Sequence, residues 1–266
     1  ISINQEKSPA APTNLTASYS SGTVSLSVDN PTGNSDYMIY RSTSEDPATA
    51  QPISNGVVDI TTWEDNSVEG TNTYYYWVRS YDSQGLASSL SAKAKCKVGY
   101  KISTVEDLVR IGRASQGWQL NRNYYLDNDL DFNNDSSYAD PETTEFGDVN
   151  GDGSTDGLKT ELTTSSGWQP IPGGFTGHFD GLNHQIANLY IDRDADNQGL
   201  FAKLSEGAVI KDLTINTATM KTASKAGVLA GETEGAEINN ITVKNSSIDI
   251  YRTDEIIAEG GGTGSI

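Results

Sequence analysis

The chain has 266 residues, of which 36 are acidic and 18 basic, so its formal net charge is −18. This balance argues against nucleic-acid binding and against docking on an anionic membrane, because both need clustered lysine and arginine. No apolar run approaches the roughly 20 residues that span a bilayer. Abundant glycine and small polar residues favour turn-rich β structure, and the length predicts two domains or one large all-β domain.

Residues 1–9 are polar and proline-flanked, as expected of an N-terminal arm or linker. Residues 10–99 contain short runs of alternating apolar and polar residues separated by turns, the pattern of a β-sandwich. The expected strands are Leu15–Tyr19, Val24–Val28, Tyr37–Arg41, Val57–Ile60, Tyr74–Tyr81 and Ala92–Val98. The single cysteine, Cys96, shares the apolar face of the last run with Ala94 and Val98. We therefore interpret it as a core residue.

The segment from Trp63 to Gly85 resembles the E–F–G region of fibronectin type III domains, and residues 12–17 resemble their first strand. The resemblance covers about residues 10–98. It implies that Tyr74 is the corner tyrosine, whose hydroxyl bonds to the backbone of the preceding loop. Val28 stands where this family often has a core tryptophan, so Trp63 or Trp77 would have to fill that volume. Such domains serve as spacers or binding modules, and the fold alone implies no chemistry.

Residues 100–266 contain a repeat. One motif recurs at Ile186–Ile191, Ile210–Ile215 and Ile238–Val243, and a second recurs in step at Gly199–Ala202, Gly227–Gly231 and Glu255–Ala258. This periodicity predicts a β-solenoid, whose stacked coils share one interior. Asn188, Asp212 and Asn240 would then align in a polar ladder, while a β-sandwich with accidental similarity is the alternative. The last coil stops at Ile266, so we expect the natural protein to continue or another chain to cover that end.

Residues 100–180 are expected to cap the solenoid. Ser103 and Glu106 form a capping box before a short amphipathic helix, and an acidic insertion occupies about residues 133–167. The order of the motifs, which ends in the coils that begin at Gly199 and Gly227, resembles the GLUG-motif repeat region of large secreted bacterial adhesins and immunoglobulin-A-protease-like surface proteins. Ala202 and Glu255 depart from that pattern, since glycine is common at both places. The resemblance implies a secreted or cell-surface protein.

The acidic insertion contains a candidate calcium loop. Asp148, Asn150, Asp152 and Asp156 occupy loop positions 1, 3, 5 and 9, with Gly153 at position 6. The backbone carbonyl of Ser154 would supply position 7. Position 12 is Lys159 instead of an acid, so Glu161 would have to substitute, or Asp131, Asp135 or Glu145 from outside the loop. The loop resembles the isolated calcium loops of dockerin and thrombospondin-like repeats. A solvated acidic turn is the alternative.

Other candidate residues carry weaker signals. Asp192, Asp194 and Asp196 alternate in a loop that could hold a second cation or simply be solvated. The two histidines, His178 and His184, are interpreted as surface or turn residues in preference to a catalytic dyad. Trp118 and Trp168 are interpreted as core residues of the cap, with stacking on a sugar as the alternative. Four Asn-x-Ser/Thr sites leave glycosylation open: Asn14, Asn134, Asn240 and Asn245.

Together these features predict an all-β chain, with a fibronectin type III-like sandwich followed by a capped β-solenoid (β-helix) with an inserted calcium loop. The expected function is that of a non-catalytic, Ca²⁺-binding segment of an extracellular adhesin, bacterial or archaeal. A cell-surface protein or glycan would be its ligand. The alternatives are accessory modules of a larger secreted protease or glycoside hydrolase, and a filament subunit that self-associates through its open end.

Overall fold

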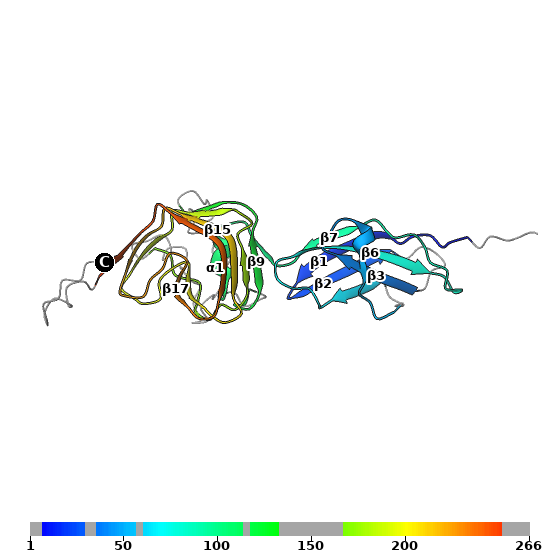
Figure 1. The fold of residues 1–266 in the computed structure, drawn as a ribbon, viewed down its shortest axis with the longest axis horizontal. Coiled ribbons are helices and arrows are strands. Elements are labelled where there is room, and N and C mark those ends of the chain that lie inside the picture. Colours follow the sequence, from blue (N-terminus) through cyan, green and yellow to red (C-terminus); the bar gives the residue numbers. More distant parts are fainter. Residues whose placement is uncertain (1–6, 30–35, 57–60, 114–117, 133–166, 252–266) are drawn as a thin grey trace, which may run out of the picture. The chain divides into compact units, whose positions relative to one another are not determined.

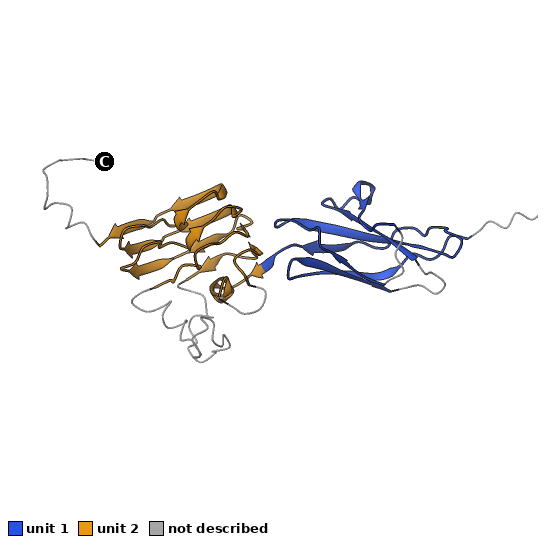
Figure 2. Cartoon of the chain, turned by 90° about the horizontal axis from the view of Figure 1, so that it is seen from below, with its two compact units in different colours: residues 1–100 blue, residues 101–266 orange. Residues whose placement is uncertain are grey.

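The computed structural model describes residues 7–29, 36–56, 61–113, 118–132 and 167–251. The chain divides into two compact units, residues 1–100 and residues 101–266 (Figure 2). The boundary agrees with the predicted one within a residue. The predicted strand Val57–Ile60 and the calcium loop lie outside the described residues.

The first unit is a sandwich of two antiparallel sheets (Figure 1). One sheet contains β1 (Thr13–Ser20), β2 (Thr23–Asp29) and β5 (Thr62–Asp65) in that order. The other contains β4 (Gln51–Pro52), β3 (Asp36–Ser42), β6 (Thr73–Tyr81) and β7 (Ala94–Lys97). A short 3₁₀ turn, η1 (Pro47–Thr49), joins β3 to β4. This division of strands confirms the predicted fibronectin type III-like sandwich.

The alternation of side chains explains the core of this sandwich. Along β2, Val24, Leu26 and Val28 are buried while the residues between them are exposed. Trp63 packs partly buried against the same cluster, whereas Trp77 lies on the other face of its strand beside Tyr75. Of the two tryptophans proposed for this volume, Trp63 is therefore the one that meets the core.

The second unit is built from parallel strands (Figure 1). Its largest sheet has the order β10-β12-β15-β11-β9-β8, and β18 pairs with β15. Smaller sheets are β13-β16-β19 and β14-β17. The strands are β8 (Tyr100–Ile102), β9 (Asn123–Leu126), β10 (Leu130–Asp131), β11 (His178–Asp180), β12 (Gln185–Ala187), β13 (Tyr190–Arg193), β14 (Phe201–Leu204), β15 (Val209–Asn216), β16 (Thr219–Thr222), β17 (Ala230–Thr233), β18 (Glu237–Lys244) and β19 (Ser247–Ile250).

Neighbouring strands pair in a regular register. Ile210 lies beside Ile238, 28 residues later, and Ile191 lies beside Met220, 29 residues later. Long β15 spans two shorter partners, because its first half pairs with β11 and its second half with β12. Ile186 therefore lies beside Ile215, not beside Ile210 as the sequence motif suggested.

The predicted polar ladder is consequently only half correct. The side chain of Asn240 donates to Asp212 at 2.7 Å, as expected of stacked neighbours. Asn188 does not continue this column, because its side chain donates instead to Asp131 at 2.6 Å. Its backbone N–H donates to the carbonyl of Asn216. The physical reason is the four-residue turn Gly181–His184, which shifts the register of β12 against β15.

The helix α1 (Val105–Arg110) begins one residue later than predicted. The capping box consists of Thr104 and Asp107, in place of Ser103 and Glu106. The hydroxyl of Thr104 accepts from the backbone of Asp107, and the carboxylate of Asp107 accepts from the backbone of Thr104. This frame places Val105, Leu108 and Val109 on one buried face.

Candidate functional site

The predicted calcium residues Asp148, Asn150, Asp152, Ser154, Asp156 and Glu161 lie outside the described residues. Of the carboxylates proposed to complete the site, Asp131 is described, and it accepts the hydrogen bond from Asn188. Within the described ranges, no three His, Cys, Asp or Glu side chains gather in a way that could hold a metal ion. Calcium binding therefore stays a prediction.

The acidic loop after β13 does not assemble a cation site. Asp192 accepts a hydrogen bond from the Tyr190 hydroxyl at 3.0 Å and lies 3.7 Å from the Lys221 ammonium. Asp196 accepts from the Ser224 hydroxyl on the neighbouring loop. These two carboxylates are engaged with groups of the chain itself, which agrees with the interpretation as an ordinary loop.

The two histidines occupy different places. His178 is half-buried on β11, where burial and then the positive charge of Lys211 lower its pKa. His184 lies in the turn before β12, and its Nδ1 is 3.0 Å from Asp129. Lys211 also lies 3.3 Å from the buried Asp180. The contacts of each histidine are thus with other groups, as the turn-and-surface interpretation predicted.

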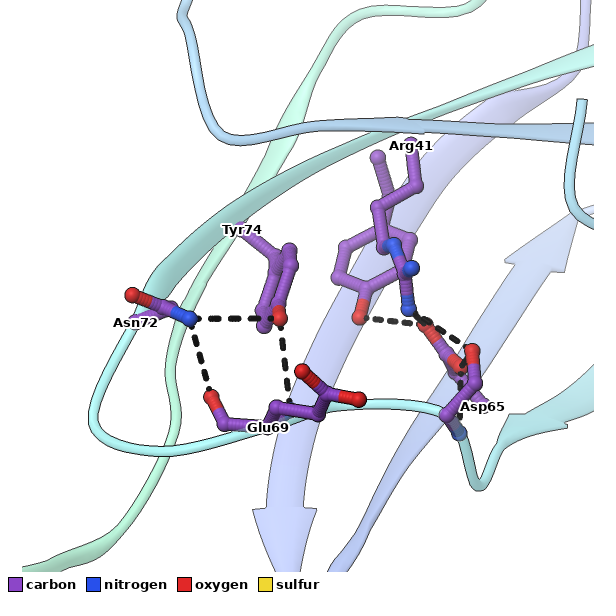
Figure 3. A network of polar contacts seen from close by, with 7 residues as sticks. Arg41, Asp65, Glu69, Asn72 and Tyr74 are labelled. Atoms are coloured by element: carbon purple, nitrogen blue, oxygen red, sulfur yellow. Dashed lines mark hydrogen bonds and ion pairs between the residues drawn. The ribbon is translucent and has the colours of Figure 1, made fainter. Parts of the chain in front are cut away.

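A polar network is buried inside the first unit (Figure 3). The carboxylate of Asp65, only 1% exposed, accepts from the Arg41 guanidinium at 2.7 Å and from the Tyr76 hydroxyl at 3.0 Å. The Ser67 hydroxyl and backbone N–H donate to its other oxygen. Burial alone would raise the pKa of Asp65, but the bonds from Ser67 and Arg41 outweigh it and hold that pKa below its ordinary value.

The predicted corner tyrosine adjoins this network. The backbone N–H of Glu69 donates to the Tyr74 hydroxyl at 3.2 Å, and the guanidinium of Arg41 lies 4.7 Å from the centre of the Tyr74 ring (Figure 3). The side chain of Asn72 donates to the carbonyl of Glu69. These contacts tie the loop before β6 to the sheet. The sequence signalled Tyr74 but not the Arg41–Asp65 pair, because those residues lie on different sheets.

The two tryptophans of the cap have different environments. Trp168 is fully buried, and its indole Nε1 donates to the carbonyl of Leu200 at 3.1 Å, so it is a core residue as predicted. Trp118 is half-exposed and faces a shallow hollow of about 550 Å³. The lining of this hollow is Gly112, Trp118, Gln119, Leu120, Asn121, Gly174 and Thr176.

The last strands of the second unit leave apolar side chains exposed. Ile210, Ile215 and Met220 are fully buried, yet their register partners Ile238, Val243 and Ile248 are 42%, 46% and 39% exposed. Tyr251 is 47% exposed. Among the described residues, β18 pairs with β15 and β19 with β16, each on one edge only. The side chains of this end therefore lack the covering that the previous strands receive.

Comparison with known proteins gives a partial match. No family model matches the chain. Halomucin of Haloquadratum walsbyi is 29% identical over 163 residues, which is 58% of this chain but 2% of that protein. The chain thus spans a small fraction of this relative. In the part of the chain that the structure describes, no helix is long and apolar enough to cross a membrane.

Solved fibronectin type III structures align with about a third of the chain. An Fn3-like protein from Clostridium thermocellum is 28% identical, with 34% of this chain and 94% of that chain covered and a TM-score of 0.31. The fibronectin type III domain of human fibronectin type III domain containing protein 3 is 15% identical, with 35% and 89% covered and a TM-score of 0.30. The N-terminal third of the chain is a fibronectin type III-like module.

Proposed function

We propose that the chain is a non-catalytic segment of an extracellular, adhesin-like surface protein. In this proposal the fibronectin type III-like sandwich is a spacer, and the second unit is a GLUG-like β-solenoid that presents a binding surface. The distant similarity to halomucin, a much longer protein, supports a surface location weakly. The acidic composition is compatible with an exterior environment.

The observation that carries the proposal is the parallel register of the second unit. Strands β15 and β18 pair along their length with a 28-residue offset, and β16 and β19 repeat the same offset. A constant offset on two sides is what successive coils of a solenoid require, since each coil adds the same length of chain. A stack of this kind suits a rigid, repetitive surface better than an enclosed active site.

Calcium has a structural role in this proposal. Asp148, Asn150, Asp152, the carbonyl of Ser154, Asp156 and Glu161 would supply oxygen ligands for Ca²⁺, the ion that such loops prefer. Between Asp127 and Glu161 the chain has 11 acids and one base, Lys159, so a bound divalent cation would offset part of a local charge of −10. The ion would order the insertion instead of taking part in a reaction.

The test is binding of the fluorescently labelled whole chain to intact bacterial and archaeal cells, run beside hydrolysis assays on casein and polysaccharides. We expect saturable binding that unlabelled chain displaces, with no turnover of either substrate. Turnover would favour the alternative of modules from a secreted protease or glycoside hydrolase. Absence of binding to every cell surface would contradict the adhesin-like role.

The exposed end of the second unit favours a second candidate, a subunit of an extracellular filament. Ile238 and Val243 lie on a strand with a free edge, which can accept a strand from another copy. Self-association would bury them. Sedimentation velocity over a range of concentrations should show oligomers that Ile238→Lys with Val243→Lys abolishes. The control is Leu182→Lys, since Leu182 is a comparably exposed apolar residue elsewhere. A monomer at every concentration would exclude this candidate.

A further inference from the structure

We propose that the hollow beside Trp118 is a binding site for a neutral saccharide. This inference rests on the proposed adhesin-like function and assigns its ligand contact to one place. The lining combines one aromatic ring and one apolar side chain, Trp118 and Leu120, with three uncharged hydrogen-bonding side chains. Those three are Gln119, Asn121 and Thr176.

The chemistry of the lining matches a sugar better than other small ligands. A saccharide has patches of C–H groups, which pack against an indole, and hydroxyls, which both donate and accept hydrogen bonds. Amides offer a donor and an acceptor in the same group, and the threonine hydroxyl does the same. No charged side chain lines the hollow, so it offers no counter-charge to a phosphate or carboxylate. The nearby Arg110 is already paired with Asp107 at 3.2 Å.

The polar groups of the lining are available to a ligand. Gln119, Asn121 and Thr176 are exposed, and no side-chain hydrogen bond joins any of them to the residues that the structure describes. Trp168 provides the contrast, because its Nε1 is bonded to Leu200 and its ring is fully buried. The exposed part of the Trp118 ring and three solvated polar groups therefore face the same space.

The backbone around the hollow is held in place, which limits the entropy lost on binding. The Trp118 ring stacks on Tyr124 with centroids 5.8 Å apart, and the Tyr124 hydroxyl donates to the carbonyl of Gln119 at 2.7 Å. The carbonyl of Leu120 accepts from the backbone N–H groups of Thr176 and Gly177, both at 3.0 Å. Two segments far apart in sequence are thus fixed to each other at the site.

Glycine provides the open space. Gly174 has φ +88°, and a Cβ added there would meet no described heavy atom within 4 Å, so this wall of the hollow carries no side chain. The volume of about 550 Å³ lies within the usual range for small-molecule sites. A short oligosaccharide is therefore the class of ligand that fits.

The test applies the whole chain to an array of neutral and acidic oligosaccharides, and then titrates the strongest neutral binder by calorimetry. Two variants probe the hollow: Gln119→Ala with Asn121→Ala removes hydrogen bonds, and Thr176→Trp fills the space. Both change exposed side chains, so thermal melts should stay close to the unmodified chain. Gln84→Ala is the matched control, because Gln84 is an exposed glutamine of the first unit.

We expect a neutral oligosaccharide to bind and both hollow variants to weaken it at least tenfold, with the control unchanged. Binding that both variants leave within twofold would overturn the site while leaving glycan adhesion elsewhere on the chain. Binding of acidic sugars alone, or of no sugar by a chain that still binds cells, would overturn the inference but not the proposed function. Loss of cell binding in the unmodified chain would instead count against the proposed function.

Discussion

Arg41 and Asp65 form an ion pair of 2.7 Å that joins the two sheets of the sandwich, with Arg41 on β3 and Asp65 at the end of β5. The Asp65 side chain is 1% exposed and that of Arg41 20% exposed. The pair thus stands at a place where one sheet could shift against the other. Its loss should be felt in the stability of this unit.

The first prediction concerns this pair. Asp65→Ala should lower the free energy of unfolding by about 3 kcal/mol, because a half-buried guanidinium and the Tyr76 hydroxyl lose their common acceptor. Urea denaturation of the whole chain, followed by Trp63 and Trp77 fluorescence, measures it. Glu64→Ala is the control, since its exposed neighbour on β5 should change stability by well under 1 kcal/mol. Equal effects would contradict the assignment.

The second prediction concerns pH. Because the native pKa of Asp65 lies below its ordinary value of 3.8, its charged form stabilises the native state. This contribution is complete above 3.8 and disappears as the pH falls through the lowered native pKa. We therefore expect Asp65→Asn to be much less stable than the unmodified chain at neutral pH, with the difference shrinking in acid. Hydrogen exchange of the β6 amides measures it, and a constant difference would contradict the linkage.

The third prediction concerns the corner tyrosine. Tyr74→Phe removes the hydroxyl that accepts from Glu69 and should cost about 1 kcal/mol of stability. Tyr75→Phe is the matched control on the same strand, because its hydroxyl bonds to Glu45, whose side chain is largely exposed. The control should therefore lose less. Chemical denaturation of both variants decides, and a larger loss for Tyr75→Phe would contradict the corner assignment.

Local patterns predicted the sandwich well, and long-range pairing explains what the sequence missed. The strand that contains Val24 and Leu26 alternates with period two, so its buried face can be deduced from its own residues. Asp65 gives no such sign, because its partner Arg41 is 24 residues away. The pairing of Arg41 with Asp65 depends on how the sheets meet, which no local pattern contains.

In the second unit the repeat was recognised, but its register was partly wrong. The motif around Ile186 matches the motif around Ile210 in composition, yet Ile186 lies beside Ile215. The turn Gly181–His184 is longer than the matching stretch of β15, and sequence similarity alone does not reveal such an offset. The hollow at Trp118 was likewise hidden, since Thr176 reaches it from a segment more than 50 residues further along.

The fourth prediction tests the close packing of the parallel strands. A Cβ added at Gly199 would lie 2.3 Å from the backbone oxygen of Gly227, so Gly199→Ala must displace backbone. We expect a loss of about 1–3 kcal/mol, the usual cost of overpacking. Gly173→Ala is the control, because its added Cβ would be 3.6 Å from the Lys203 side chain. Thermal melts followed by Trp168 fluorescence compare them, and equal stability would mean that the strands are packed less tightly there.

The fifth prediction tests calcium, with a readout that needs no biological ligand. If Ca²⁺ binds the native state alone, a concentration 100 times the dissociation constant should add about 2.7 kcal/mol to the free energy of unfolding. Thermal melts in Ca²⁺ and in EDTA, with isothermal titration beside them, measure this. Asp148→Ala with Asp152→Ala should abolish both the stability gain and the binding heat. The matched control is Asp192→Ala with Asp194→Ala, which removes two acids from the loop after β13 and should leave Ca²⁺ binding intact. Equal loss in both double variants would indicate a general charge effect, and no binding heat in the unmodified chain would make the insertion a solvated acidic loop.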